Sequence, residues 1–360
     1  MGNFKKIISG FHYANDISRN IFGGQELVYV VEGGWSIEWD GKQITNSLNK
    51  QKLISARITP LDIFLQNKIV HYGSINAFLD ENGIKNKKIK QKNKVVVTWF
   101  HIPSDDRRVK YIPLLNEYTD IVHTSCRLTQ EKLIKYGLKK GKIVVIPLGV
   151  DLSIFKPKTK IEREQIRKKL NLPDGKIIIG SFQKDGVGWG EGLKPKLVKG
   201  PDIFLKVIQN ISKTLPIFVL LTGPARGYVK RGLEKMEIPY RHDYLQNYYD
   251  IVDYYNALDL YLVTSREEGG PKAILESMAC GIPLVTTRVG MAPDILIDKK
   301  SAMIVEIDDI NKLVEVSLDV LENKKLKKII IANSLRDIKK YDWGNIASQY
   351  YQKIYSNLTY

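Results

Sequence analysis

The sequence predicts two α/β domains, each built on a mainly parallel sheet. Short runs of β-branched and apolar residues alternate with segments of helical periodicity through both halves of the chain. This alternation is the pattern of parallel strands joined by crossover helices. At 360 residues the chain is long enough for two such domains, each with its own core. Its 43% hydrophobic and 26% charged residues are typical of a soluble globular protein.

The sequence composition also indicates the cellular compartment in which we expect the protein. No apolar run reaches the roughly 18 residues of a membrane span. The first residues, MGNFKKIISGFHY, lack the long apolar core of a secretory signal, so we expect a cytoplasmic protein. Cys126 and Cys280 are the only cysteines, and both fall in predicted helical segments. This usage favours reduced, buried thiols over a disulfide framework or a metal site.

Strands and helices alternate in the first half after an aperiodic start, residues 1–26, which we expect to be irregular. The expected strands are 27–31, 53–58, 69–71, 95–100 and 120–122, with helices over 40–49 and 129–136. Gly33, Gly34 and Trp35 turn out of the first of these strands. A glycine turn at this place opens the binding crevice of a Rossmann-like domain, although many ordinary turns have the same composition.

The second half repeats the alternation after a strand and a proline-glycine linker at 142–157. The expected strands are 177–181, 216–222, 258–263, 284–287 and 302–305. The expected helices are 161–170, 201–211, 272–279, 310–321, 324–340 and 345–358. Residues 244–255 are rich in tyrosine, which fits either a core stripe or a surface beneath a nucleotide base.

The most informative stretch is residues 264–281, TSREEGGPKAILESMACG. It reads as a strand end, a tight turn at Gly269 and Gly270, and a helix that begins near Pro271, a residue suited to the first helical turn. The first N–H groups of a helix have no intrahelical partner, and the positive end of the dipole lies behind them. The turn therefore has the properties of a phosphate-binding site.

Two carboxylates bracket this turn: Glu268 enters it, and Glu276 lies two helical turns further on. Groups at the mouth and along the side of one helix are placed to hold opposite ends of an elongated ligand. A nucleotide-diphosphate sugar has that shape, with sugar, diphosphate and ribose in line. Two solvated glutamates on an ordinary helix are the alternative, which the surrounding eighteen-residue context disfavours.

Residues 268–276, EGGPKAILE, resemble the Glu-x7-Glu signature of retaining glycosyltransferases of family 4, which have the GT-B fold. The resemblance implies that Glu268 lies at the transferred sugar and that Glu276 binds the ribose hydroxyls. It further implies that the backbone from Gly269 and Gly270 through Pro271 to Lys272 holds the diphosphate. The commoner family form has an aromatic residue and a glycine where this chain has Gly270 and Pro271.

The same resemblance gives domain boundaries. The stretch 142–157 is similar to the interdomain segment of that family, usually written with Asn where Leu148 stands. It implies a Rossmann-like acceptor-binding domain at 1–157 and a Rossmann-like nucleotide-sugar-binding domain at 158–344. The two domains would face a cleft, and a C-terminal helix at 345–360 would cross back to the first domain.

Cations for the diphosphate are expected after the first strand of the second domain. The family has a Gly-Arg pair there, whereas this chain has Ser181, so Lys184 is the candidate substitute and Lys199 keeps its expected place at a helix start. Gly223 and Arg226 lie at another helix start, where Arg226 either contacts phosphate or faces solvent. No Asp-x-Asp pair is present, so we expect no metal and no cofactor besides the donor substrate.

Two histidines follow or end strands of the first domain, and the family commonly places one near the transferred sugar. We favour His101, which ends a β-branched run and precedes a loop; His71 is the alternative, and a structural histidine is possible at either position. By the same resemblance, Gly33, Gly34 and Trp35 form the acceptor-side loop.

The formal net charge is +17, and six lysines fall within residues 85–94: Lys85, Lys87, Lys88, Lys90, Lys92 and Lys94. One interpretation is a solvated loop. The other is a contact with anionic lipid headgroups or an acidic acceptor, each lysine near a charged membrane contributing about 1 kcal/mol. Nucleic acid is not expected as a partner, because no recognised binding motif accompanies the charge.

These inferences predict a retaining hexosyltransferase that uses a nucleotide-diphosphate sugar and a glycan or lipid-linked acceptor. We expect it in the cytoplasm, with possible peripheral attachment to a membrane through the lysine run. Two alternatives stay open: a phosphorylase or synthase-like enzyme of the same architecture, and a non-enzymatic polyanion-binding protein.

Overall fold

The computed structural model describes residues 14–24, 26–33 and 36–359. They form two compact units, one of Met1–Leu148 with Trp343–Tyr360 and the other of Gly149–Asp342. The division falls before the expected boundary at 157, because linker residues bond to the second unit: Val150 N–H donates to Tyr341 O at 2.9 Å, and Lys156 O accepts from Asn256 Nδ2 at 3.2 Å.

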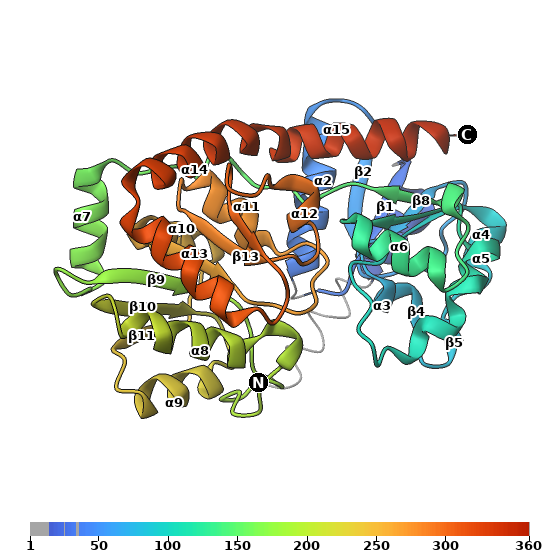
Figure 1. The fold of residues 1–360 in the computed structure, drawn as a ribbon. Helices are drawn as coiled ribbons and strands as arrows, with labels where there is room; N and C mark the ends of the chain where they lie inside the picture. Colours follow the sequence, from blue (N-terminus) through green and yellow to red (C-terminus); the bar gives the residue numbers. More distant parts are fainter. Residues whose placement is uncertain (1–13, 25, 34–35, 360) are drawn as a thin grey trace, which may run out of the picture. The chain divides into compact units, whose positions relative to one another are not determined.

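The first unit contains a six-stranded sheet in the order β2-β1-β3-β6-β7-β8, and every neighbouring pair is parallel. Its strands are β1 (Leu27–Val30), β2 (Ala56–Thr59), β3 (Ile69–Tyr72), β6 (Lys94–Thr98), β7 (Ile121–Thr124) and β8 (Ile143–Val145) (Figure 1). Strands covered on both faces are rich in buried apolar residues, and all four residues of β1 are buried. The predicted parallel α/β fold class is confirmed for this unit.

Helices and short elements complete the first unit. They are α2 (Ser36–Lys50), α3 (Ile75–Phe78), β4 (Leu79–Asp80), β5 (Gly83–Ile84), α4 (Ile89–Lys92), η1 (Arg107–Leu114), α5 (Leu115–Tyr118), α6 (Arg127–Lys135) and η2 (Lys140–Lys142). Residues 14–22 are helical, so the expectation of an irregular start is wrong for the described part of it. The small antiparallel pair β4–β5 was not expected either, because two-residue strands leave no periodic signal.

The C-terminal segment belongs to the first unit, where α15 (Trp343–Lys353) packs beside α2 and is followed by η6 (Tyr355–Asn357) (Figure 1). Trp343 meets Trp39 of α2 edge to face, with ring centroids 5.8 Å apart. Gln51 Nε2 donates to Gly344 O at 2.9 Å, and Ser348 Oγ donates to Gln51 Oε1 at 2.8 Å. Apolar and polar contacts together therefore hold this helix on the unit.

The second unit repeats the architecture with the strand order β11-β10-β9-β12-β13-β14, again all parallel. The strands are β9 (Ile177–Ser181), β10 (Ile217–Thr222), β11 (Tyr240–Asp243), β12 (Leu260–Val263), β13 (Leu284–Thr287) and β14 (Met303–Val305). Of these, β11 was not predicted, because its polar sequence YRHD lacks the apolar content of the others. The predicted fold class is confirmed here as well.

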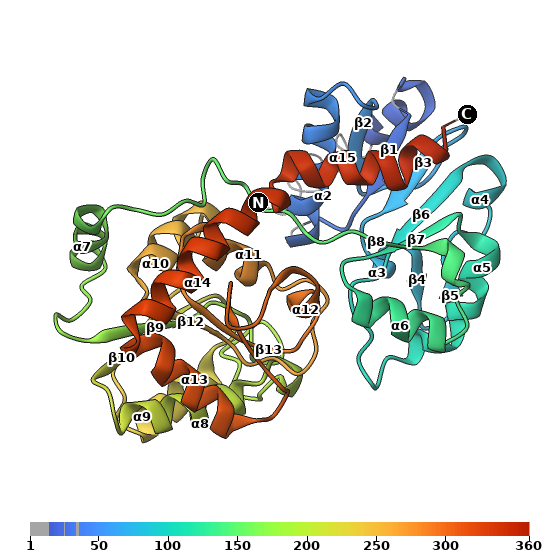
Figure 2. The same ribbon diagram turned by 45° about the horizontal axis from the view of Figure 1, so that its top comes forward.

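The helices of the second unit cover both faces of this sheet. They are α7 (Lys160–Lys169), η3 (Leu197–Lys199), α8 (Pro201–Ser212), α9 (Gly227–Lys235), η4 (Tyr248–Asp250), α10 (Ile251–Ala257), α11 (Lys272–Ala279), α12 (Ala292–Ile295), α13 (Ile310–Glu322), α14 (Lys324–Asp337) and η5 (Ile338–Tyr341). Figure 2 shows α8 and α13 next to each other, and the two helices are in contact. Their apolar faces share one buried cluster with the central strands, which forms the core.

Candidate functional site

The strand order of the second unit places its candidate site. Numbered within this sheet the order is 3-2-1-4-5-6, so the direction of winding reverses between β9 and β12. In open parallel sheets, ligands bind beyond the carboxyl ends of the two strands at this reversal. Lys184 and Lys199 follow β9, and Glu268 follows β12. Three of the predicted donor-site residues thus come from the two loops that leave this point.

Backbone hydrogen bonds join the two loops. The N–H groups of Arg266 and Glu267 donate to Val198 O at 2.8 and 3.1 Å. Gly200 has a left-handed φ of 63°, and a Cβ at this position would lie 1.8 Å from Thr264 O. Only glycine permits this close approach, so the N-cap residue of α8 also fixes the distance between the loops.

Glu268 and Lys199 form an ion pair at this junction, with Lys199 Nζ 2.5 Å from Glu268 Oε2. The two side chains are 21% and 9% exposed respectively, so the pair is largely removed from water. Ser265 Oγ donates to Glu268 Oε1 at 3.0 Å and lies 3.3 Å from Gln183 Oε1. The carboxylate is therefore held at both oxygens, with a cation on one of them.

Lys184 and Lys196 increase the positive charge around this pair. Desolvation and the neighbouring charge of Lys199 lower the pKa of Lys196, and Lys184 acts on it in the same direction. Lys184 Nζ also lies 3.7 Å from the ring centroid of Trp189, within the range of a cation–π contact. Sequence reasoning did not single out Lys196, which the spacing of KPKLVK does not distinguish from a surface lysine.

The turn into α11 lies beside Glu268. Pro271 is the N-cap, with φ −67° and ψ 104°, and Ile274 N–H donates to Pro271 O at 3.0 Å. The N–H groups of Gly269 and Gly270 have no hydrogen-bond partner among the described residues. On the other side, Gly290 has a φ of 52°, and a Cβ there would lie 2.4 Å from Gly269 O. The turn thus holds two amides without a partner among the described residues, while Gly290 packs closely against its backbone.

Glu276 is buried and lies on α11, as predicted, but the structure adds its partners. Tyr255 of α10 donates its hydroxyl to Glu276 Oε2 at 2.7 Å, and Tyr248 of η4 donates to Oε1. Burial, and then the negative charge of Glu276, raise the pKa of Tyr255, which keeps its hydroxyl protonated as a donor. The tyrosine content of 244–255 was noted in the sequence, but its pairing with Glu276 depends on tertiary contacts.

Arg226 does not face solvent, because its side chain is fully buried. Its Nη1 donates to Ser181 O at 2.6 Å and to Thr222 O at 2.8 Å, and its Nε lies 3.0 Å from Asp185 Oδ1. Burial raises the pKa of Asp185, and the Arg226 charge opposes that shift. Arg226 therefore fixes the carboxyl ends of β9 and β10 to each other.

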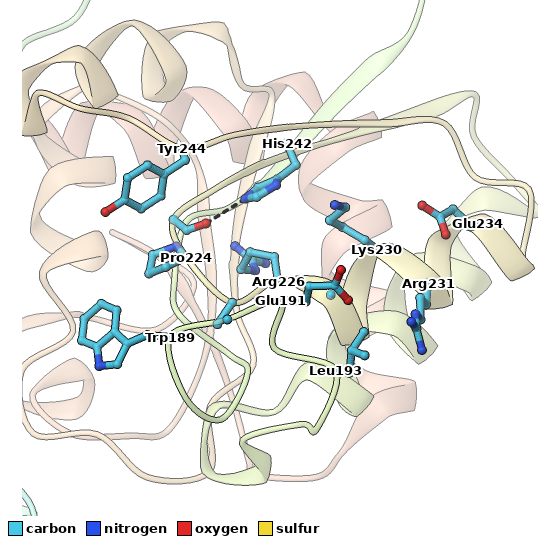
Figure 3. Close-up of a pocket in the computed structure, with 14 residues that line it drawn as sticks. Trp189, Glu191, Leu193, Pro224, Arg226, Lys230, Arg231, Glu234, His242 and Tyr244 are labelled. Carbon is cyan, nitrogen blue, oxygen red and sulfur yellow. Dashed lines mark hydrogen bonds between the residues drawn. The ribbon is translucent and has the colours of Figure 1, made fainter.

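A pocket of about 480 Å³ opens where β10 and β11 end. Figure 3 shows Trp189 and Tyr244 at one end of this pocket and Lys230, Arg231 and Glu234 of α9 at the other. Its remaining lining residues are Gly190, Glu191, Leu193, Gly223, Pro224, Ala225, Arg226, Gly227 and His242. The predicted Gly223 thus lies in the pocket wall, where its carbonyl accepts a hydrogen bond from His242 Nε2 at 2.7 Å.

The start of α9 is closed by the glycine-rich insertion that precedes Lys199. Gly227 N–H donates to Glu191 O at 2.6 Å, and Tyr228 N–H donates to Gly192 O at 3.0 Å. Insertion carbonyls thus satisfy two of the first helical N–H groups. The start of α9 is accordingly a poorer phosphate site than the start of α11.

The histidines of the first unit differ in environment. His71 is fully buried, with Nδ1 2.6 Å from Tyr355 Oη and Nε2 2.8 Å from Thr98 Oγ1. His101 is exposed and follows β6, and its carbonyl accepts from Trp99 Nε1 at 3.0 Å. These environments favour His101 over His71 as a residue that reaches a ligand. Gly33 is a turn residue after β1, while Gly34 and Trp35 lie outside the described residues.

The lysine run is not one continuous loop. It includes α4 and the start of β6, and Lys90 Nζ pairs with Asp120 Oδ1 at 2.5 Å. Lys85, Lys87, Lys88 and Lys92 are exposed. In the part of the chain that the structure describes, no helix is both long enough and apolar enough to cross a membrane.

Comparison with known proteins finds a family model that matches part of the second unit. Residues 191–337 match the family model of glycosyl transferases group 1. A D-inositol 3-phosphate glycosyltransferase of Xylanimonas cellulosilytica is 24% identical over 64% of this chain and 55% of its own length. A lipopolysaccharide core biosynthesis mannosyltransferase of Rhizobium meliloti is 25% identical over 53% of this chain and 54% of its own. The chain thus spans about half the length of these curated relatives.

Solved structures match over most of the chain. The Anabaena protein HepE, crystallised in complex with UDP-glucose, superposes with a TM-score of 0.73 at 16% identity and covers 92% of this chain and 100% of its own. A glycosyltransferase from Rickettsia africae superposes with a TM-score of 0.68 at 16% identity, covering 92% and 98%. At identities this low, a structural match shows the fold and no more. The chain therefore has the GT-B fold, and its residues 191–337 match the family model of glycosyl transferases group 1.

Proposed function

We propose that this protein is a retaining glycosyltransferase that moves a hexosyl unit from a nucleotide-diphosphate sugar to an acceptor hydroxyl. The observation that carries the proposal is the junction at the ends of β9 and β12. There a lysine, a carboxylate and two backbone amides that have no partner within the described part of the chain lie together: Lys199, Glu268, Gly269 and Gly270. Such a junction offers positive charge for a diphosphate and a hydrogen-bond acceptor for sugar hydroxyls.

The donor would lie along α11. In this arrangement the transferred sugar contacts Glu268, and the diphosphate contacts Lys199, Lys184 and the amides that lead through Pro271 to Lys272. Glu276, further along the helix, binds the ribose. Tyr244 and Trp189, at one end of the pocket, offer flat aromatic surfaces for the base, and Gly223 and Pro224 also line the pocket. Trp189, which lines this pocket, also contacts Lys184 through its ring. This contact supports a continuous path for the donor from the pocket to Lys184.

In the reaction, the bond between the anomeric carbon and the diphosphate oxygen breaks while the acceptor oxygen bonds to that carbon and loses its proton. Negative charge develops on the departing diphosphate. Lys199, Lys184 and the amides of Gly269 and Gly270 are placed to stabilise this charge, which is a route that needs no metal ion. We propose no further cofactor, and the sugar-binding role of His101 remains a prediction.

The acceptor is a glycan or a lipid-linked hydroxyl compound in this proposal. The name of one relative supports this class, since it is a lipopolysaccharide core biosynthesis mannosyltransferase. The exposed lysines of the 85–94 run supply positive charge for an anionic acceptor or membrane surface. Gly33 of the first unit keeps its proposed place in the acceptor-side loop.

A thermal-shift screen tests the donor. Uridine, guanosine and adenosine diphosphates and their hexose conjugates are added singly, and we expect one base to raise the melting temperature, because a ligand of the folded form stabilises it. Glu276→Ala should abolish that shift at the same ligand concentration. A chain that responds to no nucleotide, yet binds polyanions with a steep salt dependence, would be a binding protein instead.

A further inference from the structure

One face of the first unit carries bulky apolar side chains that extend into solvent. They come from the helical residues 14–22 and from the loop 60–68, which joins β2 to β3. Phe22 is 82% exposed and Phe64 is 60% exposed. Single exposed apolar residues are common, whereas a group from two adjoining segments is a candidate contact surface. We call this group the apolar tip; its members are Ile21, Phe22, Ile63 and Phe64.

The buried side chain of Asn20 joins the two segments. Its Nδ2 donates to Ile63 O at 2.8 Å and to Leu61 O at 3.3 Å, and its Oδ1 accepts from Arg57 of β2. A buried amide that is bonded through both its nitrogen and its oxygen fixes the end of the helix to the loop. The next two residues of the helix are therefore held beside the loop, which brings the members of the apolar tip together.

Phe64 has a backbone conformation that bulky residues rarely adopt. Its φ is 61°, in the left-handed region, where an aromatic residue is an outlier. The chain that follows is anchored, because Leu65 is buried and its carbonyl accepts from Asn93 Nδ2 at 2.9 Å. Asn67 N–H donates to Lys92 O at 2.8 Å. Such conformations persist where the surrounding structure imposes them, and they gather at functional positions. Here the imposed conformation leaves the Phe64 ring in solvent.

Cations border the apolar tip. Lys68, the last residue of the loop, donates from Nζ to Gly23 O at 3.0 Å, so its ammonium lies next to the end of the helix. On the other side, the hydrogen bonds made by Asn93 and Lys92 hold α4 against the loop. The helix, the loop and the lysine run 85–94 together contain eight lysines and arginines against two aspartates. The exposed cations among them are Arg19, Lys85, Lys87, Lys88 and Lys92.

We propose that this surface docks on an anionic lipid bilayer, with the apolar tip inserted among the headgroups and the surrounding cations at the level of the lipid phosphates. Attachment of this kind scales with the buried apolar area plus the attraction to anionic lipids, and the surface supplies both. A second copy of the chain fits less well, because a symmetric contact would bring two positive faces together. The proposal does not rest on glycosyl transfer, since none of these residues belongs to the donor junction.

Sedimentation with lipid vesicles tests the docking. The unsubstituted protein should bind phosphatidylglycerol vesicles about tenfold more tightly than phosphatidylcholine vesicles, because its cations attract anionic headgroups. The double variant Phe22→Ser, Phe64→Asn should lower the partition coefficient on phosphatidylglycerol by roughly 100-fold, since each buried phenylalanine contributes on the order of tenfold. Asparagine tolerates a left-handed φ better than phenylalanine does, so thermal melting should show a folded variant. Equal binding to the two lipids would overturn the assignment to an anionic surface.

The matched control is the double variant Ile161→Ser, Ile297→Ser, which removes two exposed apolar side chains of the second unit. It should sediment with phosphatidylglycerol vesicles as the unsubstituted protein does. Equal partition coefficients for the control and the Phe22→Ser, Phe64→Asn variant would overturn the insertion of the apolar tip.

Fluorescence reports insertion directly. The emission that Phe22→Trp adds should shift to shorter wavelength with phosphatidylglycerol vesicles and should be quenched by brominated lipid, whereas the emission that Ile161→Trp adds should not change. Emission from Phe22→Trp that is already at short wavelength without vesicles would show that the protein itself covers the tip. Light scattering that shows a dimer, lost in the Phe22→Ser, Phe64→Asn variant, would show that a second copy covers it. Either result would overturn the lipid assignment.

Discussion

The ammonium of Lys199 lies 2.5 Å from the carboxylate of Glu268, so the residue proposed for the diphosphate and the residue proposed for the sugar neutralise each other. A donor that binds here exchanges this ion pair for contacts with its own phosphate and hydroxyls. Removing the charge of Glu268 and removing the charge of Lys199 should therefore change the affinity for a nucleoside diphosphate in opposite directions.

Glu268→Gln should strengthen the binding of a nucleoside diphosphate while lowering turnover of the sugar donor by about 100-fold. The amide no longer competes for the Lys199 ammonium, yet it is a weaker acceptor for sugar hydroxyls. Lys199→Ala should weaken diphosphate binding. Calorimetry and initial rates measure both quantities, and Lys194→Ala, an exposed lysine of the same loop, is the control. Weaker diphosphate binding by Glu268→Gln would contradict the competition.

Acid should destabilise the first unit through its buried histidines. Burial lowers the pKa of His123 to about 4, and burial together with the charge of His123 lowers that of His71. Both groups are neutral in the folded state, so the unfolded state binds more protons below its own pKa near 6.5. Their stabilisation is complete above pH 6.5 and decreases, by up to about 1.4 kcal/mol per pH unit for each histidine, as the pH falls towards 4.

Urea unfolding between pH 7 and pH 5 measures this dependence, since few carboxylates titrate in that window. His123→Gln should flatten the decrease, because glutamine carries no titrating group while it can still donate to Ile146 O, which His123 Nε2 contacts at 2.9 Å. A stability that is constant from pH 7 to pH 5 would show that these histidines do not titrate on unfolding.

Gly290→Ala should weaken the binding of a nucleoside diphosphate by displacing the turn at Gly269. The added Cβ would lie 2.4 Å from Gly269 O, and the φ of 52° is unfavourable for alanine. The backbone has to move, and with it the two unpaired amides. Gly141→Ala meets no atom within 4 Å and is the control for a general effect of the substitution. Equal diphosphate affinities in the two variants would show that the amides of this turn do not contribute to diphosphate binding.

Chelation should leave turnover intact. We attribute stabilisation of the leaving diphosphate to Lys184, Lys199 and backbone amides, so initial rates measured with and without excess EDTA should agree. A Lys184→Ala variant should be slower in both conditions. A loss of activity in EDTA that Mg²⁺ restores would show that a metal ion, and not these groups alone, stabilises the leaving diphosphate.

Reversing charge in the lysine run should weaken attachment to anionic vesicles. Lys87, Lys88 and Lys92 are exposed, and each lysine near such a surface contributes about 1 kcal/mol. Substitution of all three by Glu should reduce sedimentation with phosphatidylglycerol vesicles, whereas the same change at Lys324, Lys325 and Lys328 of α14 is the control for net charge. Equal sedimentation of the two triple variants would favour the solvated-loop interpretation.

Much of the second unit follows from local pattern. The strands β9 and β13 and the helix α11 have the bounds that the sequence predicts, because β-branched runs and a proline-started amphipathic segment are strong signals. Polar β11 and the short turn η4 give no such signal, although they carry His242 and Tyr248. In the first unit, the helix at 14–22 was missed for the same reason.

The sequence alone determined the two parallel α/β units, the strand-turn-helix around Gly270, and the carboxylates on either side of it, since each depends on residues close together in the chain. Only the tertiary structure decided that Lys199 neutralises Glu268, that Tyr248 and Tyr255 hold Glu276, and that Arg226 is buried on Asp185. Such pairs join loops or helices that follow different strands. Their distances depend on the order in which strands assemble into a sheet, which no local periodicity encodes.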